Sequence, residues 1–132
     1  MAFGTATVVT TSGKVTAANR LQTTPTRNPP KFIAIGTGAT SPGARTAAVG
    51  DTALTTEVET RATGTESIVT VTAANDAYQT QGTITATGAR SVDEAATFDA
   101  STTGNIDISA TFGVITLATN DSLQLTFKHQ MT

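Results

Sequence analysis

Short segments in which apolar and polar residues alternate fill the last two-thirds of this chain, and this pattern most limits its possible folds. In residues 106–112 and 123–127, every second side chain is apolar. A period of two is the repeat of a half-buried β-strand. Turn signals such as Ala-Ala-Asn-Asp and Thr-Thr-Gly-Asn separate the segments at roughly 8–12-residue intervals, a spacing typical of sandwiches and barrels. The pattern predicts an all-β fold.

The expected architecture is a β-sandwich with jelly-roll or Ig-like Greek-key connections, although alternation does not determine the strand order. About a quarter of the residues are threonine, which favours pleated surfaces and keeps an outward face wettable. A strand buried on both faces is expected first. We predict strands at residues 31–36, 67–72, 78–87, 91–99, 106–112 and 123–127.

The first 30 residues have a different character from the rest, so we divide the chain into an N-terminal segment, 1–30, and a β-sandwich domain, 31–132. The segment begins with an extended arm. Thr11 or Ser12 then caps one short helix, and three prolines make residues 24–30 a linker. Further on, Asp51 or Thr52 is expected to cap a second short helix.

Composition excludes several classes of protein. Charged residues make up 14% of the chain and the net charge is −2, so no cationic surface for nucleic acid is expected. No apolar run approaches the roughly 18–20 residues of a membrane span. The N-terminus lacks the features of a signal peptide, which predicts a protein made in the cytoplasm of its host and not exported. Cysteine is absent, which removes thiolate chemistry.

No arrangement of residues in the sequence points to catalysis. His129 is the only histidine, and we interpret it as a polar residue of the surface or of an interface. Glu57 and Glu59 would point the same way from a strand, but a glycosidase pair is disfavoured where aromatic residues are few. The other acids lie on separate turns and are interpreted as solvated side chains: Asp93, Glu94, Asp99, Asp107 and Asp121. We predict no enzyme, cofactor, metal site or small-molecule substrate.

Several segments resemble small virion proteins of tailed bacteriophages. The similarity runs through most of the chain from Lys31 onward, and its motifs are turn glycines and core aromatics. The matching segments are residues 35–38, 51–54, 78–90, 94–101, 112–117 and 121–123. The chain departs from the pattern at Asn120, where a glycine is expected, and at Phe127, where a tryptophan is expected.

The resemblance implies a capsid decoration or cement protein that stabilises the shell. Such a protein forms homo-oligomers, with a trimer favoured, and binds the major capsid protein at the virion surface. A tail, fibre or head–tail structural protein of the same fold is the alternative. A carbohydrate-binding β-sandwich is a second alternative, which the low aromatic content of 5% disfavours.

Interface residues are expected near the N-terminus, because an extended arm must pack on its own sandwich or on a neighbouring subunit, and the sequence leaves both open. Four basic residues of this region would suit an acidic surface on a partner. The predicted protein-interface residues are Phe3, Val8, Val9, Lys14, Arg20, Leu21, Arg27 and Lys31.

Overall fold

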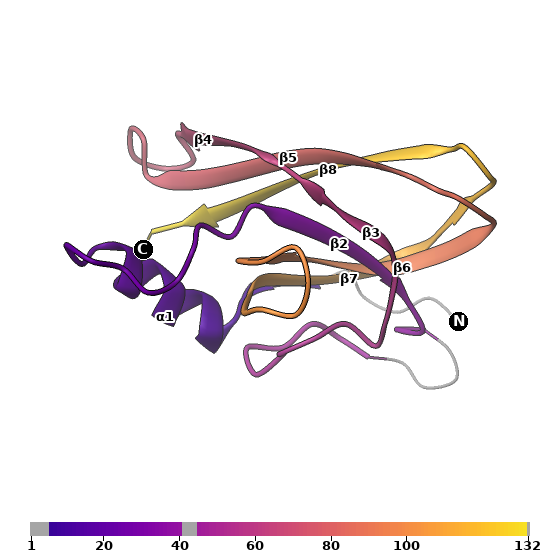
Figure 1. The fold of residues 1–132 in the computed structure, drawn as a ribbon, viewed down its shortest axis with the longest axis horizontal. Helices are drawn as coiled ribbons and strands as arrows, with labels where there is room; N and C mark the ends of the chain where they lie inside the picture. The colour runs from indigo at the N-terminus through magenta and orange to yellow at the C-terminus, as the bar shows by residue number, and fades with distance from the viewer. Residues whose placement is uncertain (1–5, 41–44, 132) are drawn as a thin grey trace.

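The computed structural model describes residues 6–40 and 45–131, and over this range the predicted all-β sandwich is confirmed (Figure 1). Every strand pairing is antiparallel. The predicted interface residue Phe3 lies outside the described residues. The elements are β1 (Ala6–Val9), α1 (Thr11–Arg20), β2 (Phe32–Thr37), β3 (Thr56–Thr63), β4 (Thr65–Val69), β5 (Ala77–Thr85), β6 (Arg90–Phe98), β7 (Ile106–Leu117) and β8 (Ser122–Gln130).

Two sheets form the layers of the sandwich. One has five strands in the order β1-β7-β6-β2-β3, and the other has three in the order β4-β5-β8. Apolar side chains from both layers meet between them, and burial of this surface supplies the main driving force for folding. The central members of this core are Ile33, Ile35, Ile84, Val92, Ile108 and Phe127.

The middle of the five-stranded sheet, formed by β2, β6 and the first half of β7, is buried on both faces. A second apolar cluster, which includes Leu54, Ala96 and Phe98, lies on its outer side. The segment from Arg45 to Thr56 covers this side and passes beneath β6 and β7 in Figure 1. Consequently β6 is buried without interruption over residues 92–98 and β7 over residues 106–111. The alternation of β7 predicted correctly that Ile108, Ala110 and Phe112 share the core side, but it was wrong for Ile106, which lies in the outer cluster because the pairing with β6 shifts register next to it. The polar face of β7 is also covered.

From residue 6 onward, the N-terminal arm packs on its own sandwich. β1 is an edge strand that pairs with β7 over Val9↔Ile108 and its neighbours. Thr10 follows it, fully buried, and donates its hydroxyl to the carbonyl oxygen of Ile106 at 2.9 Å. The same hydroxyl oxygen accepts from the amide of Gly13, so Thr10 is the N-cap of α1. The sequence predicted Thr11 or Ser12 as the N-cap, which is one or two residues too late.

The proline-rich linker folds back on α1. The side-chain carbonyl of Asn19, near the end of the helix, accepts hydrogen bonds from the amides of Thr26 and Arg27. The guanidinium of Arg27 in turn donates to the carbonyl and hydroxyl oxygens of Ser12. The middle of the linker is thus held against the helix, and Pro29 and Pro30 line the same groove as residues of α1.

The second predicted helix, at Asp51 or Thr52, is wrong. The carboxylate of Asp51 accepts from the amide of Ala48, the hydroxyl of Ser109 and the guanidinium of Arg45. Burial alone would raise the pKa of Asp51, but these three donors outweigh it and lower the pKa. A side chain engaged with the sheet and with preceding residues cannot cap a helix that follows it.

The free energy of unfolding is expected to fall as the pH drops below about 4. Asp51, Glu59 and Asp76 all have lowered pKa values; Glu59 accepts first from the hydroxyl of Thr87, and Asp76 first from the amide of Ala73. A carboxylate with a lowered pKa stabilises the fold above its unfolded pKa, and the contribution is lost as the folded pKa is passed. Urea titrations at several pH values test this, with the variant D76N showing a shallower loss. A stability that rises on acidification would contradict it.

Candidate functional site

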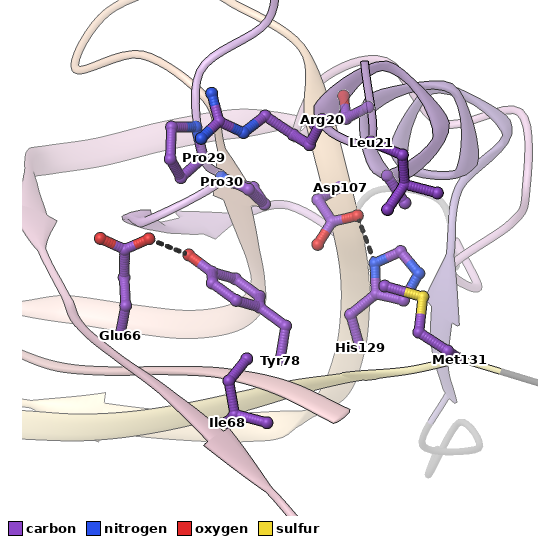
Figure 2. Close-up of a pocket in the computed structure, with 12 residues that line it drawn as sticks. Arg20, Leu21, Pro29, Pro30, Glu66, Ile68, Tyr78, Asp107, His129 and Met131 are labelled. Carbon is purple, nitrogen blue, oxygen red and sulfur yellow. Dashed lines mark hydrogen bonds and ion pairs between the residues drawn. The ribbon is translucent and has the colours of Figure 1, made fainter. Parts of the chain in front are cut away.

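A groove of about 350 Å³ opens between α1, the end of the linker and the three-stranded sheet. Figure 2 shows its polar side chains, which come from α1, β4, β5, β7 and β8. Two carboxylates, of Glu66 and Asp107, stand against one guanidinium, of Arg20. The apolar part of the lining consists mainly of Leu21, Pro29, Pro30, Ile68 and Met131.

Asp107 and His129 form the floor of the groove. Nδ1 of His129 lies 2.8 Å from Oδ1 of Asp107, and both side chains are buried (Figure 2). The interpretation of His129 as a surface residue is therefore wrong. β8 continues beyond Phe127, and its period of two turns His129 inward on the same face. Extending the alternation of residues 123–127 by one step would have found this.

Tyr78 and Glu66 form the side of the groove opposite α1. The hydroxyl of Tyr78 donates to Oε1 of Glu66 at 3.0 Å. Burial of the ring, followed by the negative charge of Glu66, raises the pKa of Tyr78. The phenol therefore stays protonated and its oxygen can also accept a hydrogen bond. Among the described residues, no Ser or Thr hydroxyl bonds to His129, whose ring nitrogen Nδ1 is engaged with Asp107.

Four of the acids interpreted as solvated are in fact buried: Asp93, Glu94, Asp99 and Asp107. Three of them accept from a loop segment folded against the carboxylate, whereas Asp107 is paired with His129 of β8. Asp93 accepts from the amides of Ala39 and Thr40, and Asp99 accepts from Asn105. A carboxylate can be buried at low cost only where such donors are present. Asp121, by contrast, is exposed as predicted.

Glu94 holds the covering segment against the outer face of the sheet. Its side chain is fully buried, and Oε2 lies 2.7 Å from the guanidinium of Arg45. Arg45 also pairs with Asp51 at 2.7 Å, and the amide of Thr56 donates to Glu94. This network lies on the far side of the sheet from the core and has a structural role.

Glu57 and Glu59 do not form a carboxylate pair. Glu59 has a positive φ of 64°, which interrupts the alternation of β3. Each glutamate binds a different arginine, Glu57 with Arg61 and Glu59 with Arg90. The expectation that they point the same way is wrong because of this irregularity in the strand.

Half of the predicted interface residues lie around the groove and a hollow that adjoins it across Met131: Val9, Lys14, Arg20 and Leu21. Three of the others, which the structure also describes, lie elsewhere. Val8 is paired in the sheet, Arg27 is held by α1, and the ammonium of Lys31 lies 6.0 Å from a phenylalanine ring. The structure thus concentrates the basic residues less than their spacing in the sequence suggested.

No group of three or more His, Asp or Glu suited to a metal ion occurs within residues 6–40 and 45–131. In the same part of the chain, no helix has the length and hydropathy that a membrane crossing requires.

Comparison of the chain with protein-family models, with curated proteins and with solved structures gave no match. The structure itself defines the fold class, an antiparallel β-sandwich with one short helix. The groove beside that helix is the candidate binding site.

Proposed function

We propose that this protein is a structural subunit of the virion of a tailed bacteriophage, which decorates the capsid surface. It forms homo-oligomers, with a trimer favoured, and bridges neighbouring copies of the major capsid protein. Its work is done by surface contact, repeated over many copies, so that individually modest interfaces add up to firm attachment. The sequence segments that resemble small virion proteins support this proposal.

The observation that carries the proposal is the cluster of exposed apolar side chains at the mouth of the groove. Leu21, Ile68 and Met131 are 89%, 61% and 53% exposed, although each is a large apolar residue. Isolated exposed apolar residues are common, but several around one hollow are typical of a protein-binding surface.

The double variant L21S/I68S is expected to weaken binding to undecorated capsids by at least about tenfold, since two apolar side chains would no longer be buried there. Both residues are exposed, so the fold is expected to remain intact. Sedimentation of capsids with increasing protein measures the affinity. V114S, an exposed apolar residue toward the other end of β7, is the matched control and should bind as the wild type does.

Native mass spectrometry of the wild-type protein measures its oligomeric state separately. A monomer that also fails to bind capsids saturably would overturn the proposal. An oligomer that binds phage tails but not capsids would place it instead in the tail or at the head–tail junction.

A further inference from the structure

One oxygen in the floor of the groove has no hydrogen-bond donor. Asp107 is 1% exposed and its Oδ1 is bonded to His129, but Oδ2 has no partner among the described residues. Buried polar atoms in folded proteins nearly always have a partner, because leaving one unpaired is costly. Oδ2 is therefore an acceptor for a donor that the described residues do not supply.

The neighbouring groups are also acceptors. In Figure 2 the free oxygen of Asp107 points away from His129, toward the side of the groove where Tyr78 lies. Tyr78 donates its only proton to Oε1 of Glu66, so its oxygen retains acceptor capacity. Two carboxylates and a phenol oxygen thus line one side of the groove, which favours a cationic donor.

We propose that the groove binds a lysine side chain from a partner protein, with the ammonium at Oδ2 of Asp107. The methylene groups of the lysine lie along Ile68 and Pro30, and apolar neighbours of the lysine cover Leu21 and Met131. The inference rests on the proposed function only in taking the lysine from a protein partner. Whether that partner belongs to a virion is a separate matter.

Lysine fits this floor better than arginine. Only one oxygen of Asp107 is free, whereas the guanidinium fork is matched to two parallel acceptors. An ammonium has three donors that rotate about one bond, so it can reach acceptors on different strands. The combination of an apolar stem with a charged end also matches the lining, which is apolar around a few polar atoms.

Arg20 is the one Lys or Arg among the described residues that line the groove, and it leaves the floor free. Its guanidinium donates to the carbonyl oxygen of Arg27 at 3.2 Å, and in Figure 2 it lies over Pro29, away from Asp107. Oδ2 is covered by its neighbours, so entry of an ammonium requires the side chains at the mouth to shift. Leu21, at 89% exposure, is the side chain least held in place.

The test uses the full chain, labelled with ¹⁵N, and two capped pentapeptides that serve as probes. One peptide has a lysine between two leucines, and its twin has norleucine in place of the lysine. The lysine peptide is expected to shift the amide resonances of Ile68, His129 and Met131 saturably. Its dissociation constant should be at least about tenfold lower than that of the norleucine twin, since a charge-assisted hydrogen bond is formed.

The variants assign this difference to named atoms. D107N keeps the shape of the side chain and an acceptor for His129, but it removes the charge, and it should abolish the preference for lysine. Glu66 lies at the exposed mouth, so E66Q is expected to fold even if D107N does not, and it then provides the test. E66Q should reduce the preference for the lysine peptide over the norleucine peptide by about threefold. R20Q removes the competing cation and should strengthen lysine binding.

Three outcomes would overturn the inference: no saturable shift, equal affinity for the two peptides, or a lysine preference that E66Q and a folded D107N leave unchanged. A peptide in which arginine replaces lysine and binds more tightly would also overturn it. Failure of the proposed function is distinguishable, because capsid binding and oligomeric state are measured without these peptides. The lysine preference can hold for a protein that binds no capsid.

Discussion

Replacing Arg45 with methionine is expected to lower the free energy of unfolding by about 3–5 kcal/mol, since it leaves a buried carboxylate without its cation. Glu94 is 0% exposed and keeps only the donors of Thr55 and Thr56 once Arg45 is removed. Methionine fills much of the volume of arginine, so the lost free energy of unfolding reports the positive charge of Arg45 and its hydrogen bonds. Urea unfolding gives the free energy, and the melting temperature should fall by roughly 10 °C or more.

The matched control is R20M. Arg20 is exposed and donates only to a backbone carbonyl, so its replacement should change stability by less than about 0.5 kcal/mol. The double variant R45M/E94Q should recover part of the loss, because a neutral amide no longer needs a cation. If R45M unfolds like the wild type, the covering segment does not depend on this network.

Most strands of the sandwich could be predicted from the alternation of apolar and polar residues, but β3, whose only apolar residues are Val58 and Ala62, was missed. Where one face of a strand meets the core, apolar residues recur at every second position, as at Leu123, Leu125 and Phe127. Order among the strands could not be predicted, since β2 pairs with β6 and β3, and nothing local in their sequences specifies such partners. The sequence also did not reveal that residues 45–56 cover the outer face of the sheet, because polar residues on one side of a strand normally indicate that this side is exposed to solvent.

Asp93 and Glu94 show why the buried polar groups escaped prediction. An acidic residue in a strand is usually exposed, and only long-range contacts change that. The donors to these two carboxylates lie more than 35 residues away in the sequence, in a loop whose path depends on the finished sheet. The floor of the groove could not be predicted for the same reason, since Asp107 and His129 come from different sheets and meet only in the finished fold.

Leu21, in contrast, was predicted as an interface residue before its surroundings were known, and the structure places it at the mouth of the groove. A leucine after the last turn of a polar helix has few ways to be buried within one chain. The groove itself depends on the linker, because Pro29 and Pro30 lie beside α1 only after Asn19 and Arg27 have fixed that segment. The exposure of Leu21 could therefore be anticipated from the sequence, whereas the shape of the groove requires the fold.

Replacing Gly13 with alanine is expected to destabilise the protein by about 1–3 kcal/mol, which reverses the usual effect of this change in a helix. In an open helical position the change stabilises by about 1 kcal/mol, because glycine loses more conformational freedom on folding. Here a methyl group at Gly13 would meet the carbonyl oxygen and the carboxylate of Asp107. β7 is held by β1 and β6 on either side, so this carbonyl cannot move away.

Whether G13A lowers or raises the free energy of unfolding tests whether α1 packs directly against Asp107 in the floor of the groove. G113A is the matched control, since an added methyl group there meets no other atom within 4 Å and the φ is not positive. It should therefore change stability much less. Urea unfolding of both variants gives the comparison, and ¹⁵N spectra should show the resonances of Asp107 and His129 shifted in G13A alone. A G13A protein that is more stable than the wild type would mean that the helix lies farther from β7, and the groove would then lose the wall on which its proposed ligand depends.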